Sequence, residues 1–324
     1  MSRLNGNLAL LLLLLLLLAV PLALMAGQVW IDPLGSPVRH AVPILMELRL
    51  PRTLLAAVLG AGLGGAGAAM QGYLRNPLAD PGLFGVAPMA ALGAVLSLFT
   101  GYAAQEFLLP AFALGGAALG MALLALIAGR EGGLALFTLA GMMIASLAGA
   151  LTSLAISLSP NPFAMSEIVT WLMGALADRG WHEVAIATPL TLAGLALLVL
   201  AGPALDALTL GEAAARSLGV RHGRLQALMI AGVGLVVGGG VAVAGIVGFV
   251  GLVVPHLVRP WTDQRPSALI APSALAGALL VVVADALCRL VPLQGGELRL
   301  GIALSLIGAP FFLRLLVQLR REIA

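Results

Sequence analysis

The sequence predicts an all-α integral membrane protein. Of its 324 residues, 61% are hydrophobic and 10% charged, whereas soluble domains are about half apolar and a quarter charged. Its 41 glycines are typical of membrane helices that pack backbone to backbone. The apolar runs are too long for the alternating strands of a transmembrane barrel. At about 20 residues per crossing, the length allows roughly ten helices.

Ten apolar stretches, mostly separated by Pro and Gly, are expected to cross the membrane. The first follows Arg3 and has a cleaved signal peptide as its alternative, but its length favours a retained helix. We expect the seventh and eighth stretches to divide near Gly238–Gly240. The stretches are 8–27, 53–73, 83–100, 107–128, 134–158, 183–203, 225–242, 243–258, 268–288 and 300–317.

The distribution of arginine predicts the orientation, because cytoplasmic loops carry the excess of basic residues. With a cytoplasmic N-terminus, eleven arginines fall inside and six outside. This bias predicts ten helices with both termini in the cytoplasm. The inner set is Arg3, Arg75, Arg130, Arg216, Arg221, Arg224, Arg259, Arg265, Arg314, Arg320 and Arg321. The outer set is Arg39, Arg49, Arg52, Arg179, Arg289 and Arg299.

Missing residue types exclude several kinds of chemistry. All 17 basic residues are arginine, so the lysine of a nucleotide-binding P-loop is absent and any ATP-driven work needs a partner chain. Neither His-Glu-x-x-His nor Gly-x-Ser-x-Gly occurs, which argues against an intramembrane enzyme. The one cysteine, Cys288, cannot form an intramolecular disulfide.

One polar passage, "MQGYLRNPLADPG" (Met70–Gly82), interrupts the apolar pattern between two expected spans. Unpaired backbone groups are not tolerated in lipid, so this break must lie in water or inside protein. The residues alone leave an ordinary polar turn as an alternative. The break contains Arg75, Asn76, Pro77, Asp80 and Pro81.

Four segments, in order and at the expected spacing, closely resemble the FecCD family of permease subunits of type II ABC importers. They are "RLPRTLLAAVLGAGLGGAGAAMQGYLRNPLADPGLFG" (49–85), "LGEAAARSLGV" (210–220), "GIVGFVGLVVPHLVR" (245–259) and "IGAPFFLRLL" (307–316). Two positions depart from the family pattern. Arg299 occupies a place where the family commonly has proline, and Gln264 stands where the family often has histidine.

The resemblance implies one permease domain over residues 1–324 in the bacterial inner membrane, working as a two-fold homodimer. It implies import of a bulky metal chelate, with iron-siderophore, haem and cobalamin left open. Two copies of an ATPase subunit would bind ATP and Mg, and a periplasmic or extracellular binding protein would deliver the substrate. We expect no metal or cofactor in this chain, no catalytic residue and no nucleic-acid partner.

The segment 205–224 is too long for a simple turn and too charged to span the membrane. Thr209 and Glu212 could form a capping box and Gly219 suits the position after a helix, which predicts a short helix of about nine residues. A solvated surface helix is the alternative. The resemblance implies a coupling helix that docks on the ATPase, flanked by Arg221 and Arg224. Its expected contact residues are Leu210, Gly211, Glu212, Ala215, Arg216, Leu218 and Gly219.

The resemblance also implies a cytoplasmic gate and an outer docking site. Asn76 and Leu78 would form the gate, with Leu134 and Ala135 after the next inner loop as partners. Arg49, Arg52 and Arg289 would receive carboxylates of the binding protein, because guanidinium suits paired carboxylate recognition. Interfacial snorkelling is the alternative for the first two arginines.

Three further patterns favour structural roles. Three Gly-x-x-x-Gly pairs predict close helix contacts. His256 is expected to be a hydrogen-bonding group rather than a metal ligand. Asp285 could mark a proton path in a rival secondary transporter, but Arg289 one turn later favours an ion pair. The glycine pairs are Gly60 and Gly64, Gly116 and Gly120, and Gly234 and Gly238.

Overall fold

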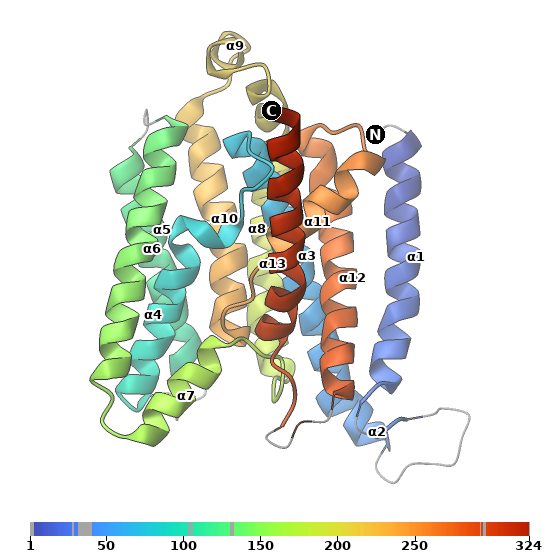
Figure 1. The fold of residues 1–324 in the computed structure, drawn as a ribbon, viewed down its shortest axis with the longest axis vertical. Helices are drawn as coiled ribbons and strands as arrows, with labels where there is room; N and C mark the ends of the chain where they lie inside the picture. The colour runs from blue at the N-terminus through green and yellow to red at the C-terminus, as the bar shows by residue number, and fades with distance from the viewer. Residues whose placement is uncertain are drawn as a thin grey trace.

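The computed structural model describes residues 3–27, 29–31, 41–102, 105, 107–129, 133–291, 293 and 296–323. These residues form a bundle of helices (Figure 1). The first half contains α1 (Arg3–Met25), α2 (Ala41–Pro43), η1 (Ile44–Arg49), α3 (Leu50–Leu74), η2 (Pro81–Phe84), α4 (Val86–Phe99), α5 (Leu108–Ala128) and α6 (Leu134–Ser157). The second half contains α7 (Pro162–Leu172), α8 (Trp181–Leu208), α9 (Glu212–Ser217), α10 (His222–Ala244), α11 (Val250–Val258), η4 (Arg259–Trp261), α12 (Pro266–Leu290) and α13 (Leu300–Ile323).

Within the described residues, 8 helical stretches are long and apolar enough to cross a membrane. They are α1, the continuous run Ala41–Leu74, α5, α6, α8, α10, α12 and the part of α13 from Leu300 to Val317. The other two expected spans are shorter: α4 has 14 residues and α11 has 9. At about 1.5 Å per residue, neither reaches through a hydrocarbon core of about 30 Å.

The expected division near Gly238–Gly240 is wrong. These glycines lie inside α10, where Gly238 faces the side chain of Ala117 and Gly239 that of Leu190. The chain turns instead at Gly245, whose φ of 73° favours glycine. A further short helix, α7, lies in the passage that the sequence indicates as an outer loop.

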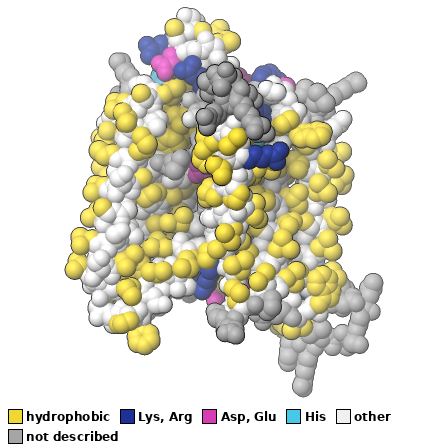
Figure 2. All heavy atoms as spheres, in the orientation of Figure 1, with side chains coloured by type: hydrophobic (Ala, Val, Ile, Leu, Met, Phe, Trp, Pro, Cys, Tyr) yellow, Lys and Arg dark blue, Asp and Glu magenta, His cyan; other side chains and the backbone are white. Residues whose placement is uncertain are grey.

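The two ends of the bundle differ in the elements they carry. Helix α9 stands at one end, and both the start of α1 and the end of α13 lie there as well, whereas α7 lies at the opposite end (Figure 1). Between them the visible face is mostly apolar, and its basic side chains gather mainly at the α9 end (Figure 2). The arrangement places both described chain ends on one side, as the arginine count predicts.

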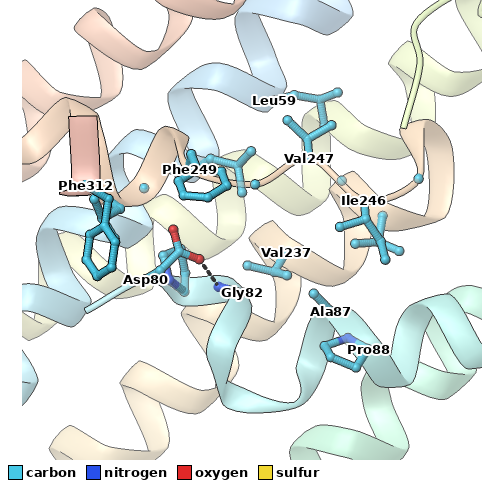
Figure 3. Close-up of a pocket in the computed structure, with 18 of the residues that line it drawn as sticks. Leu59, Asp80, Gly82, Ala87, Pro88, Val237, Ile246, Val247, Phe249 and Phe312 are labelled. Atoms are coloured by element: carbon cyan, nitrogen blue, oxygen red, sulfur yellow. Dashed lines mark hydrogen bonds between the residues drawn. The ribbon is translucent and has the colours of Figure 1, made fainter. Parts of the chain in front are cut away.

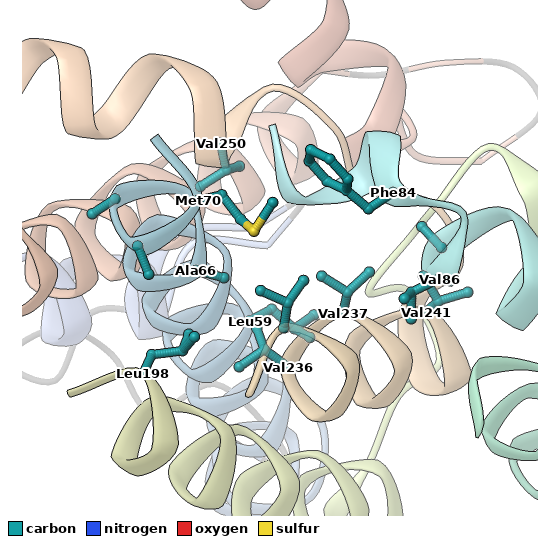
Figure 4. Close-up of a cluster of buried hydrophobic side chains, with 14 of the residues drawn as sticks. Leu59, Ala66, Met70, Phe84, Val86, Leu198, Val236, Val237, Val241 and Val250 are labelled. Atoms are coloured by element: carbon teal, nitrogen blue, oxygen red, sulfur yellow. The ribbon is translucent and has the colours of Figure 1, made fainter. Parts of the chain in front are cut away.

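Helices α3 and α10 form the centre of the bundle. In an apolar 18-residue stretch of each span, 72% of the residues are buried in the run Ala41–Leu74, which contains α3, and 78% in α10. The corresponding share in α1 is 6%. Side chains from both helices meet in one apolar cluster, with Leu59, Ala66 and Met70 of α3 facing Val237 and Val241 of α10 (Figure 4). A large part of the core is built from alanine and glycine, so these helices approach closely.

The glycine pairs confirm the predicted packing role. Gly60 and Gly64 lie against the backbone of α12 at Gly277 and Ser273, where a Cβ would overlap backbone atoms. Gly116 faces the backbone of Met89 in α4 in the same manner, whereas Gly120 faces the Met89 side chain. Close packing of this kind holds the helices together by van der Waals contact, because lipid tails are as apolar as leucine and leave no hydrophobic driving force between helices. The pair Gly234 and Gly238 packs on Met121 and Ala117 of α5.

Candidate functional site

The polar break 75–85 is folded by its own side chains. Helix α3 ends at Leu74, and the next residue, Arg75, adopts a left-handed conformation with φ of 50°. The Asn76 side chain accepts a hydrogen bond from the Leu78 amide at 2.9 Å. The Asp80 carboxylate accepts one from the Gly82 amide at 2.8 Å and caps η2. Local side chains therefore pair backbone groups that would be unsatisfied within a membrane.

A second break, 245–249, separates α10 from α11. The Ala175 amide donates to the carbonyl of Ala244 at 2.9 Å, at the last residue of α10. The Gly301 amide donates to Gly174 at 3.1 Å, which fastens the start of α13 to the same junction. Phe249 then takes a left-handed conformation with φ of 66°, uncommon for an aromatic residue, and α11 begins.

The two breaks face each other across a cavity of about 390 Å³. Leu78 and Asp80 come from the first break and Phe249 from the second, while Phe312 of α13 closes one side (Figure 3). The described lining is apolar except for Asp80, whose pKa burial raises to about 6. A cavity of this size holds a small apolar group.

Gln71 ties α3 to α11 beside the cavity. Pro255 has no amide hydrogen, so the carbonyl of Gly251 four residues earlier lacks its helical partner. The Gln71 side-chain amide donates to the carbonyls of Gly251 at 3.4 Å and Leu252 at 3.3 Å. Arg259 in turn donates to the Gln71 side-chain oxygen at 2.8 Å. Sequence reasoning missed this link, although Gln71 is a polar residue directly after a long uncharged stretch.

The expected gate residues lie in two separate places within one protomer. Leu78 packs with Phe249, Leu252 and Phe312 on the cavity wall. Leu134 begins α6 and packs instead against the main core, and Ala135 beside it is exposed. No described contact joins the two pairs. The gate assignment stays a prediction.

The expected coupling segment contains the six-residue helix α9 rather than one of about nine residues. The predicted capping box is wrong. Helix α9 begins one residue after Gly211, so Glu212 occupies its first position, and the Thr209 hydroxyl donates to the Asp206 carbonyl instead. The prediction for Gly219 is confirmed: its φ is 85° and its amide bonds to Arg216.

Helix α9 presents apolar side chains outward. Ala215 is buried against the bundle, whereas Leu210 and Leu218 are 67% and 64% exposed at the two ends of the helix. Just before α9, the Asp206 carboxylate accepts hydrogen bonds from the Ser267 amide and hydroxyl. This carboxylate caps the N-terminal turn of α12 and so joins the end of α8 to α12.

At the α7 end, the three arginines expected to dock a binding protein are engaged inside the chain. Arg49 is 8% exposed and donates to the carbonyls of Leu24, Met25 and Val29, where α1 ends. A cation that bonds the last carbonyls of a helix stabilises its C-terminus. Arg49 is therefore buried within this chain, where it holds the end of α1.

Arg52 and Arg289 share Asp285. The Arg52 guanidinium lies 2.8 Å from one oxygen of Asp285, and Arg289 lies 3.3 Å from the other. Arg289 is 4% exposed, so it is not a surface group either, and its ion pair with Asp285 is confirmed. Arg52 also contacts Glu297 at 2.6 Å, and that carboxylate is 26% exposed. Docking through these three arginines stays a prediction.

The described residues offer little for covalent chemistry. No three His, Cys, Asp or Glu side chains among them gather closely enough to hold a metal ion. His256 makes an edge contact with Phe311, and Cys288 is buried.

A bundle of apolar helices with two breaks facing an inner cavity, and a small helix standing out at one end, defines a multi-pass membrane transport protein.

Comparison with known proteins gives the family. The model of the FecCD transport family matches residues 8–318, and the chain belongs to this family. It is 38% identical over 304 residues to the vitamin B12 import system permease protein BtuC of Vibrio cholerae, covering 92% of this chain and 89% of the relative. It is 40% identical over 281 residues to the Fe(3+) dicitrate transport system permease protein FecD of Escherichia coli, covering 86% of each.

Two further similarities extend over nearly the whole chain. The hemin transport system permease protein HmuU of Yersinia pestis is 34% identical over 309 residues, with 93% of this chain and 90% of the relative covered. A solved structure of an inward-facing, metal-chelate type ABC transporter superposes with a TM-score of 0.89 at 30% identity, covering 97% of this chain and 99% of that chain.

Proposed function

We propose that this chain is the membrane-spanning permease subunit of a binding-protein-dependent ABC importer for a metal chelate. The observation that carries the proposal is the near-complete match to import-system permeases of the FecCD family. The whole chain would act as one permease domain in the bacterial inner membrane, with its α9 end in the cytoplasm. A partner ATPase would hydrolyse ATP, because this chain has no lysine for a P-loop.

The substrate pathway would lie between two copies of the chain. A bulky chelate exceeds a cavity of about 390 Å³, so the cavity would form one wall of a wider passage. Asn76 and Leu78 would narrow this passage at the cytoplasmic side, with Leu134 and Ala135 completing the gate across the dimer. Cobalamin, haem and iron-siderophore remain the candidate substrates.

Coupling would run from α9 into the bundle. Leu210 and Leu218 would seat in a groove of the ATPase, with Gly211, Glu212, Arg216 and Gly219 around them and Ala215 holding α9 to the bundle. A displacement of α9 would act on α12 through the Asp206–Ser267 hydrogen bonds. Helix α12 packs along α3, which carries the gate segment at its end.

When the binding protein docks at the α7 end, Arg52 would exchange one of its two carboxylate partners. Asp285 is 1% exposed and fixed, whereas Glu297 is the accessible partner of the same guanidinium. A carboxylate of the binding protein would replace Glu297. Arg49 and Arg289 would keep the site in place, since both are held by bonds within the chain.

The rival function is a proton-coupled secondary transporter that uses Asp285. The geometry disfavours it, because Asp285 is 1% exposed and is paired with two arginines in a link between α3 and α12.

Reconstitution separates the two functions. Proteoliposomes would contain the permease, its ATPase and its binding protein, with cyanocobalamin, ferric dicitrate and haemin as probes. We expect one of the probes to be taken up. Its uptake should require ATP and an ATPase that faces the vesicle interior, and a proton gradient should not change the rate of uptake. Uptake by the permease alone, driven by the gradient, would contradict the proposal.

A further inference from the structure

A small cavity at the surface lies between α11 and α13, close to the α9 end. Its volume is about 250 Å³, and it is distinct from the cavity between the two helix breaks. Two of the residues that line it can carry positive charge, four are apolar and none is acidic. The lining residues are His256, Leu257, Pro260, Phe311, Arg314 and Leu315.

The polar atoms of this cavity are not used within the described chain. The Nδ1 atom of His256 is buried and has no hydrogen-bond partner among the described residues. A buried nitrogen without a partner costs free energy unless something outside the chain bonds to it. Arg314 is exposed and has no described ion pair, so its guanidinium is available to a ligand at the mouth of the cavity.

The position of the cavity matches the boundary between lipid and water. The apolar part of the α13 sequence gives way to polar residues after Val317, three residues after Arg314. Trp261, just after α11, is 69% exposed, and exposed tryptophan is typical of the membrane interface. Exposed leucines continue the surface on both helices: Leu257 is 52% exposed and Leu313 is 63% exposed. Acyl chains would lie along this apolar surface.

We propose that the cavity formed by His256 and Arg314 binds the phosphate of an anionic phospholipid. The guanidinium of Arg314 pairs with the phosphate, and His256 donates a hydrogen bond through Nδ1. The leucines on either side contact the acyl chains. Basic pockets between membrane helices on the cytoplasmic side are suited to anionic headgroups. Bound lipid joins α11, which follows the second break, to α13, which closes the inner cavity.

The test uses purified permease in detergent with phosphatidylglycerol as the probe and native mass spectrometry to count bound lipid. Arg314→Gln should weaken binding of the tightest lipid about five-fold, the factor expected for one basic contact with an anionic surface, and His256→Gln should weaken it as well. Arg314→Lys should retain most of the binding. Arg265→Gln is the matched control, because Arg265 is an exposed arginine at the same end that does not line the cavity. It should leave binding unchanged.

Two further arms identify the source of the phosphate. Phosphatidylcholine should bind at least several-fold more weakly, and inorganic phosphate at equal concentration should not displace the lipid. Equal binding of both lipids, or full displacement by inorganic phosphate, would overturn the proposal. So would an unchanged lipid count in a folded Arg314→Gln variant. If the Arg314→Gln variant lost its permease dimer with no change in bound lipid, another copy of the chain would cover the cavity. That result would also overturn the proposal.

Discussion

Arg52 and Asp285 are 233 residues apart in the sequence and form a two-pronged ion pair between α3 and α12. The Arg52 Nη2 and Nε atoms lie 2.8 and 3.0 Å from Oδ1 of Asp285. The aspartate is 1% exposed, and it also balances Arg289 one turn along α12. One buried acid therefore joins α3 to α12 at the α7 end of the bundle.

Asp285→Asn should destabilise the protein strongly. The substitution removes the carboxylate that neutralises two largely buried guanidinium groups. Removing one partner of a buried ion pair costs about 3–5 kcal/mol. Thermal unfolding in detergent can be followed with a thiol-reactive dye, because Cys288 is the one cysteine and is buried. Glu297→Gln is the control, since its partly exposed carboxylate should contribute about 0–1 kcal/mol. Equal melting temperatures for the two variants would contradict the structural role of Asp285.

Some local features of this fold are predictable from sequence, although the capping box of α9 is not, and several features that depend on distant contacts are missed. Gly219 and the break at Arg75–Pro77 are specified by neighbouring residues, so both were found. The turn at Gly245 was placed at Gly238–Gly240 instead, because glycines that pack against another helix and glycines that permit a turn look alike in sequence.

The same limit explains the outer arginines. Their exposure depends on which carbonyls and carboxylates fold against them. The Leu24 carbonyl reaches Arg49, and the Asp285 carboxylate reaches Arg52, only in the folded bundle. The sequence places them near helix ends, but it does not reveal that they are buried. The cavity between the two breaks is likewise formed by segments far apart in the chain.

The exposed leucines of the coupling segment predict a variant that separates binding from folding. Leu218→Ser removes an exposed apolar side chain, so the melting temperature should stay within error. ATPase binding should fall about ten-fold or more, because a fully buried leucine contributes about 1.5–3 kcal/mol at an interface. Leu218→Met should retain binding. Ala215→Trp, by contrast, should lower stability, because Ala215 is buried.

Cysteine labelling tests the orientation of the bundle. In a Cys288→Ala background, Ala213→Cys in α9 should react with an impermeant maleimide only in inverted vesicles. Pro160→Cys, just before α7, should react only from outside in spheroplasts. Both positions are exposed, and they lie at opposite ends of the bundle (Figure 1). Labelling of both from one side would contradict the proposed topology.

Asp80 predicts a pH-dependent stability. Burial raises its pKa from 3.8 to about 6, so the folded protein favours the protonated form. The contribution of this group to stability is therefore present at low pH, falls as the pH rises from about 4 to 6, and then stays constant. Asp80→Asn removes the charge but keeps an oxygen to accept the Gly82 amide.

The variant should therefore melt at a higher temperature than the original protein at pH 8, and the difference should shrink toward zero near pH 4. A shift of about 2 pKa units corresponds to at most about 3 kcal/mol, and partial exposure of Asp80 reduces this value because solvent screens the charge. Asp178→Asn, at an exposed turn, is the control for the same substitution outside the cavity. Asp80→Ala should be less stable than Asp80→Asn at every pH, because it also loses the cap of η2. A difference between Asp80→Asn and the original protein that is equal at pH 4 and pH 8 would mean that the carboxylate is hydrated in the folded protein.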